Sequence, residues 1–283
     1  MQREILKDLG YKFNMIVLEP PKGHLLDIMK KVFHITNKKN IKEIYSAAKL
    51  AWEKALLLDR LDKMVNSIRP VELMKGETDR VYKQAKQQIS MAKTEQELTS
   101  VQQQIFKRMS KIKKAKDKVP IKIGLVGEIY TILEPFVNLN IERQLGELGV
   151  IVERGIYISE WIRDNLFPSF LNPKEHIELL NLAEPYIRCF VGGHGRESIA
   201  QIVKYSKEGF DGVIHLLPLT CMPEIVAKSA VPLVSKDHNI PVMTLVLDEH
   251  SAETGVRTRL EAFVDLIRHR KEETGNYALL PRN

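Results

Sequence analysis

Cysteine is scarce in this sequence, since only Cys189 and Cys221 occur among 283 residues. Two cysteines cannot form the disulfide framework of a small secreted protein. No secretory signal peptide is visible, and no apolar stretch is long enough to cross a membrane. We therefore expect a cytoplasmic protein that does not enter a membrane, with both thiols free or bound to a metal.

Glycine and proline are also rare in the first part of the chain. Gly76 and Pro70 are the only glycine and the only proline within residues 24–119. Apolar residues recur there with a helical period, which suits long helices with few breaks. A compact apolar run near residues 14–19 interrupts the pattern. We predict a mostly helical region over residues 1–119, with one strand near residues 14–19.

Composition and charge set further bounds. With 44% hydrophobic residues, the chain can build a sizeable core and two structural units. Its net charge of +7 would permit contact with nucleic acid, and Lys107–Pro120 is rich in lysine. Cations at a helix C-terminus also suit the helix dipole, and no groove-reading motif accompanies these lysines. Nucleic-acid binding is therefore the least favoured interpretation.

The pattern changes after Pro120, where short β-rich runs alternate with helical segments. Strands separated by helices are typical of a parallel sheet in an α/β fold. We therefore predict an α/β domain over residues 120–283. Its β-rich runs are Ile121–Tyr130, Val150–Glu153, Gly212–Leu217 and Val242–Leu247.

Ligands of such sheets collect at the carboxyl ends of the strands. Glu128 lies near the end of the first β-rich run and is a candidate acid or base, although a lone carboxylate after a strand is more often solvated. Asp248, Glu249 and His250 follow the last strand, where burial without partners would be costly. His250 is thus a candidate catalytic residue, with a solvated loop as the alternative. The four segments that we expect at this edge are Gly127–Thr131, Gly192–Gly195, Pro218–Glu224 and Asp248–Arg259.

The segment Gly192–Ser198 reads GGHGRES and precedes a predicted helix. Glycines let backbone N–H groups approach an anion closely, and the helix start adds a favourable dipole. The segment is neither a dinucleotide fingerprint nor a Walker loop, and a tight helix start is the alternative. His194 is a candidate catalytic base, or it only bonds the neighbouring turn. The candidate cofactor-binding residues are Gly192, Gly193, Gly195 and Ser198.

Cys221 lies between a predicted strand and a predicted helix. As a structural residue it would be a small buried side chain. As a ligand or nucleophile it would benefit from the helix N-terminus, which lowers the pKa of a thiol. The position favours this second interpretation, with His250 or His194 as a conceivable base, although no protease or transferase signature surrounds the thiol. Cys189 lies in a mostly apolar run, and we expect it in the core.

The segments GEIYT, GGHGRES, LPLTCMPE and LDEHSAETGVRTRLEAFVD occur in this order along the chain. Together they resemble the C-terminal part of the 2-hydroxyacyl-CoA dehydratase D-component family, especially its acyl-CoA dehydratase activase-related and double-cubane cluster proteins. The resemblance covers most of residues 121–268. The opening of the chain also resembles a segment internal to those proteins.

This resemblance implies Rossmann-like subdomains, [4Fe–4S] clusters bound through cysteines, and electrons from an ATP-hydrolysing activase. It also implies low-potential reduction or radical dehydration of 2-hydroxyacyl-CoA thioesters, so acyl-CoA is an expected ligand. Cys221 matches the family's cluster cysteine in the C-terminal motif and is our candidate metal ligand.

A cubane cluster ordinarily needs about four ligands, and no cysteine precedes Cys189 in this chain. We therefore expect an iron–sulfur cluster shared with a cysteine-richer companion subunit, as in a truncated or split family member. The alternative is a non-catalytic α/β scaffold without a cluster. In that case the glycine loop would hold an anionic group of coenzyme A or a nucleotide.

Overall fold

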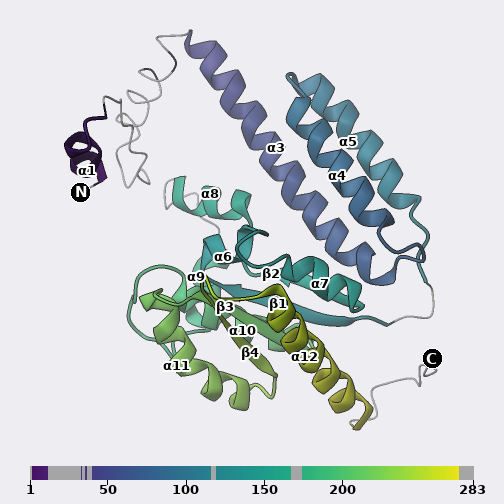
Figure 1. Ribbon diagram of the computed structural model, residues 1–283, viewed down its shortest axis with the longest axis vertical. Helices are drawn as coiled ribbons and strands as arrows, with labels where there is room; N and C mark the ends of the chain where they lie inside the picture. The colour runs from purple at the N-terminus through teal and green to yellow at the C-terminus, as the bar shows by residue number, and fades with distance from the viewer. Residues whose placement is uncertain are drawn as a thin grey trace.

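The computed structural model describes residues 2–11, 33, 36, 40–115, 119–166 and 174–273. Within these residues a helical region precedes a parallel sheet that is covered by helices on both faces (Figure 1). The predicted α/β class, with a helical N-terminal region, is confirmed. The strand predicted near residues 14–19 lies outside the described residues, and the boundary near residue 119 stays a prediction.

Three long helices dominate the described part of the N-terminal region, after the short helix α1 (Gln2–Asp8). They are α3 (Ile41–Ile68), α4 (Glu77–Met91) and α5 (Glu95–Ser110), and they lie side by side in Figure 1. A short 3-10 helix, η1 (Arg69–Val71), leads from α3 to α4. The helices pack through a common apolar cluster. Its fully buried members include Leu61 of α3, Ile89 of α4, and Ile105 and Met109 of α5.

The described strands form one parallel sheet in the order β2-β1-β3-β4. They are β1 (Ile121–Gly127), β2 (Val150–Arg154), β3 (Gly212–Pro218) and β4 (Val242–Leu247). The chain runs outward from β1 to β2, then crosses to the other side of β1 to form β3. The carboxyl ends of β1 and β3 therefore flank a topological switch point, the usual ligand position in open α/β sheets.

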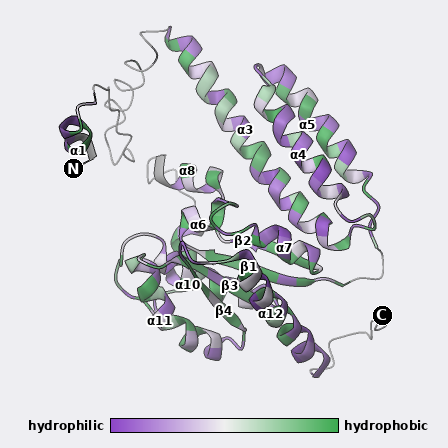
Figure 2. Cartoon of the chain, in the orientation of Figure 1, coloured by the Kyte–Doolittle hydropathy of each residue, from purple (hydrophilic) through white to green (hydrophobic). Residues whose placement is uncertain are grey.

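Helices cover both faces of the sheet. The helices α6 (Ile129–Leu133), α7 (Ile141–Glu147) and α12 (Glu253–Glu273) pack on one face. The helices α9 (Lys174–Asn181), α10 (Gly195–Lys207) and α11 (Met222–Asp237) pack on the other, and α8 (Ile158–Leu166) follows β2. The strands are largely hydrophobic, whereas the long helices carry hydrophobic residues on part of their surface only (Figure 2). No helix within the described ranges is long and apolar enough to span a membrane.

One close contact explains a glycine in the middle of β1. The ring of Tyr205 on α10 packs directly on Gly124, where an added Cβ would lie 2.2 Å from the ring carbon Cδ2. The Tyr205 hydroxyl donates a hydrogen bond to the carbonyl of Glu153, over 3.2 Å. This contact ties α10 to both β1 and β2.

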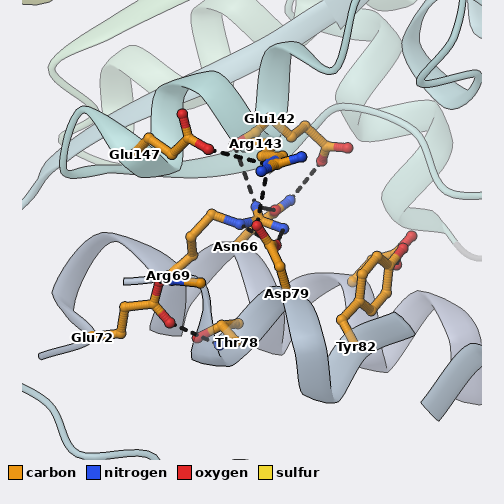
Figure 3. A network of polar contacts seen from close by, with 11 residues as sticks. Asn66, Arg69, Glu72, Thr78, Asp79, Tyr82, Glu142, Arg143 and Glu147 are labelled. Atoms are coloured by element: carbon orange, nitrogen blue, oxygen red, sulfur yellow. Dashed lines mark hydrogen bonds and ion pairs between the residues drawn. The ribbon is translucent and has the colours of Figure 1, made fainter. Parts of the chain in front are cut away.

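Polar side chains join the helical region to the sheet along a network that we call the seam (Figure 3). Arg154, at the end of β2, donates to Glu142 over 2.7 Å and also bonds Asp62 of α3. Arg69 donates to Asp79 through two nitrogens, at 2.9 and 2.8 Å. Both arginines are almost fully buried. Arg154 meets two carboxylates and Arg69 meets one, so each buried charge has an ionic partner.

Candidate functional site

The carboxyl end of β1 meets that of β3 through a tight backbone contact. The N–H of Glu128 donates to the carbonyl of Leu216 over 3.0 Å. Gly127 has a φ of 135°, and a Cβ there would lie 1.8 Å from the same carbonyl oxygen. Only glycine fits at position 127. The bond to Leu216 then holds Glu128 at the switch point.

Cys221 occupies the matching position after β3. It is the N-cap residue of α11, and its backbone N–H donates to the carbonyl of Pro218 over 3.2 Å. Its own carbonyl accepts from Ile225 over 2.9 Å, which closes the first turn of the helix. The side chain is half-buried, and it makes no capping hydrogen bond. The predicted strand-to-helix position of this thiol is therefore observed.

The electrostatic surroundings of Cys221 differ from the expectation. Burial raises the pKa of the thiol above its ordinary value, and the backbone N–H of Glu224 only partly lowers it. The carboxylates of Glu224 and Glu128 raise the pKa further, because each repels the thiolate. The helix N-terminus thus does not dominate, and the free thiol is held in its protonated form.

The glycine loop approaches the same helix start. Gly192 and Gly193 have φ values of 82° and 47°, in the left-handed region that favours glycine. A Cβ on Gly195 would lie 2.4 Å from the carbonyl oxygen of Pro223. The loop and the first turn of α11 are therefore in direct contact. We use the name cradle for the group that consists of Glu128, Gly192–Gly195 and Cys221.

Glu128 and His194 both sit at helix starts. The Glu128 carboxylate accepts from the backbone N–H groups of Tyr130 and Thr131, at 3.1 and 2.8 Å, and so caps α6. His194 caps α10 through its backbone carbonyl, which accepts from Ser198 over 2.8 Å. Its half-buried ring makes no capping bond. The structure gives Glu128 a structural role, and catalytic roles for both residues stay predictions.

The other predicted site residues are less closely associated with the cradle. Ser198 is buried and donates its hydroxyl hydrogen bond to Glu224. His250 follows β4 at the same edge of the sheet, but its side chain is 86% exposed. Its backbone N–H donates to Asp248 over 3.0 Å, within a local turn. Geometry therefore favours Cys221 and the glycine loop over His250, whose catalytic role stays a prediction.

The expectation that Cys189 lies in the core is wrong, since its side chain is exposed. The run Ile187–Val191 belongs to the loop between α9 and α10, and within this run only Ile187 is buried. The neighbouring Phe190 is 81% exposed. Outside a strand or helix, a mostly apolar run therefore does not predict that its residues are buried.

Sequence reasoning missed His215 and the buried role of Glu224. His215 lies within β3, and its Nε2 is 2.7 Å from a carboxylate oxygen of Glu224. An imidazole inside an otherwise apolar strand needs a polar partner, and this pattern was visible in the sequence. Glu224 lies in the first turn of the helix that follows the strand, close enough along the chain to be that partner.

The metal-binding capacity of these residues is limited. Across the described ranges, no three or more side chains of histidine, cysteine, aspartate or glutamate are grouped so that they could hold a metal ion. Cys221 offers a single sulfur ligand at the cradle, whereas an iron–sulfur cluster usually needs about four protein ligands. The described residues therefore do not form a complete cluster site.

Comparison with known proteins extends the resemblance seen in the sequence. The sequence profile of the family described as 2-hydroxyglutaryl-CoA dehydratase, D-component, matches residues 4–267. The match includes the helical region as well as the sheet. No protein of curated function matches the chain.

Proposed function

The chain belongs to the 2-hydroxyglutaryl-CoA dehydratase D-component family, and from this membership we propose its role in an iron–sulfur system. It is one component of a 2-hydroxyacyl-CoA dehydratase-like or low-potential reductase system. Cys221 contributes one thiolate to a cluster, and a cysteine-richer companion subunit contributes the others. An ATP-dependent activase supplies the electrons, and an acyl-CoA thioester is the expected substrate class.

The position of Cys221 is the observation that carries this proposal. The thiol is half-buried at the switch point, so a second chain can still reach it. The glycine loop contacts the first turn of α11 through Pro223, two residues after Cys221. A bound cluster would supply low-potential electron transfer, and Cys221 must lose its proton to join it.

The test is anaerobic co-expression with cysteine-rich companion candidates, followed by size-exclusion chromatography and measurement of iron and sulfide. Cys221→Ser should remove the iron that this chain helps to bind. Cys189→Ser is the matched control, because this exposed thiol lies in the preceding loop and should leave the iron content unchanged. Iron that persists at the same level in Cys221→Ser would remove the cluster assignment.

A scaffold that binds an anionic ligand is the second candidate. The observation in its favour is the pair of left-handed glycines, Gly192 and Gly193, before the N-terminus of α10. Backbone N–H groups in such a loop can hold a phosphate of coenzyme A or a nucleotide. Glu128 and Glu224 oppose this by adding negative charge near Cys221. Calorimetry of metal-free protein with coenzyme A, an acyl-CoA and ATP tests it, and no heat of binding with any of them would refute it.

A further inference from the structure

A buried polar network joins β3, α10 and the first turn of α11. Ser198 of α10 donates its hydroxyl hydrogen bond to one carboxylate oxygen of Glu224, over 3.1 Å. His215 of β3 places Nε2 at 2.7 Å from the other oxygen. Ser198 is 2% exposed, and Glu224 and His215 are both 0% exposed. We call these three residues the clamp.

The clamp gives each oxygen of Glu224 one partner. A carboxylate that is shielded from water needs such donors, because burial otherwise makes its charge costly. A proton on Nε2 makes His215 the second donor. Its Nδ1 is then a buried acceptor without a partner among the described residues. The position of the His215 ring therefore serves the contact with Glu224 and leaves the other ring nitrogen without a partner among the described residues.

The same glutamate shares the first turn of α11 with Cys221. Cys221 is the N-cap residue, and its carbonyl accepts from the N–H of Ile225, the residue after Glu224, over 2.9 Å. The residue before Glu224, Pro223, lies against the glycine loop, where a Cβ on Gly193 would be only 3.0 Å from Pro223 Cγ. The clamp fixes the Glu224 side chain against α10 and β3, and the bond from Ile225 to the Cys221 carbonyl closes the same turn. A shift of this turn would therefore move the thiol relative to the loop.

We infer that Glu224 is a positioning residue for Cys221, held in place by Ser198 and His215. This inference rests on the proposed role of Cys221 as a cluster ligand. Stabilisation of the fold does not by itself explain a buried carboxylate at position 224. Buried charged groups can often be replaced by apolar side chains of similar volume without loss of stability. An apolar side chain at Glu224 would fill the space but would lose the directional contacts to α10 and β3.

Two substitutions separate the geometry from the charge. Glu224→Gln and Glu224→Leu both remove the carboxylate, so they change the electrostatics at Cys221 equally. Glutamine keeps an acceptor oxygen for the Nε2–H of His215 and an amide N–H that the Ser198 hydroxyl can accept, whereas leucine has neither. In a Cys189→Ser background, Cys221 is the only thiol, and its alkylation by iodoacetamide reports how often the first turn of α11 opens.

We expect Glu224→Leu to be alkylated about fivefold faster than Glu224→Gln, the factor that corresponds to one net hydrogen bond. Ser198→Ala keeps the charge of Glu224 and should also react faster than its parent. Ser229→Ala is the matched control on the same helix, because the exposed Ser229 bonds only the Val226 carbonyl, and its rate should not change. Equal rates for the leucine and glutamine variants would overturn the inference.

Iron content supplies the second readout. In the complex with the companion, Glu224→Gln should retain iron and Glu224→Leu should lose it, while chemical denaturation checks that both are folded. If Glu224→Leu does not fold, Ser198→Ala takes its place, and an alkylation rate equal to that of its parent overturns the inference. A wild-type complex without iron would refute the proposed function alone, because the alkylation rates test the clamp in the isolated chain.

Discussion

Arg154 offers the sharpest test of how the helical region is held to the sheet. Its side chain is 7% exposed and contacts Asp62 and Glu142, whose side chains are 16% and 15% exposed. Burial lowers the pKa of Arg154, but the charges of Glu142 and Asp62 more than offset this and raise it above its ordinary value. The guanidinium is therefore the positive partner of two partly buried carboxylates. Arg154→Met removes this charge and keeps much of the apolar stem.

The loss of unfolding free energy in Arg154→Met depends on which hydrogen bonds Glu142 and Asp62 keep in the variant. Breaking a buried ion pair by removing one partner costs about 3–5 kcal/mol, because a charge is left uncompensated. Glu142 keeps a hydrogen bond from Asn66, and Asp62 keeps one from the Tyr82 hydroxyl. These neutral donors offset part of the loss. We therefore expect the lower end of the range, about 3 kcal/mol of unfolding free energy.

Urea unfolding, followed by circular dichroism, measures this loss. Lys63→Met is the matched control. Lys63 lies over the Tyr157 ring, as Arg154 does, and pairs with Glu160, but its side chain is 48% exposed. An exposed pair contributes about 0–1 kcal/mol, so this variant should change little. Adding Asp62→Asn and Glu142→Gln to Arg154→Met should recover much of the stability. A loss no larger than that of Lys63→Met would refute this account of the seam.

Three further predictions concern single residues. Because burial raises the pKa of Cys221, iodoacetamide should modify it more slowly than the exposed Cys189 at about pH 8, as followed by mass spectrometry. Burial also raises the pKa of Asp59, so its charged form weakens the fold once the pH rises through the folded-state pKa. Asp59→Asn should be more stable than wild type at neutral pH, and a difference that fails to vanish below about pH 4 would contradict this. Gly124→Ala should cost about 1–3 kcal/mol in urea unfolding, because its Cβ would meet the Tyr205 ring. An unchanged midpoint would show that the ring can move away.

The sheet was the most predictable part of the molecule. The prediction of Val242–Leu247 as a strand matches β4, and β3 extends only one residue beyond the predicted Gly212–Leu217. Short apolar runs between helices identify buried parallel strands, because both faces of such strands are covered. The strand-end rule then placed Cys221 correctly after β3.

The polar networks were not predictable in the same way. Arg154 bonds Asp62 from 92 positions away along the chain, and periodicity says nothing about such a pairing. Apolar patterns indicate which face of an element is buried, whereas a buried charge depends on which element packs beside it. The same limit applies to Cys189, whose apolar neighbours lie in a loop and leave it exposed.

The seam and the clamp hold different parts of the molecule and share no residue. The seam joins α3 and α4 to α7 and to the end of β2, whereas the clamp joins α10 and α11 to β3. Substitutions at sites without common partners usually have independent effects. Arg154→Met should therefore lower the unfolding free energy while leaving the alkylation rate of Cys221 unchanged in the folded protein. Ser198→Ala should raise that rate. If Arg154→Met also accelerated alkylation under native conditions, the helical region would influence the cradle through the sheet, by β1 or by the contact of Tyr205 on α10 with Glu153 of β2.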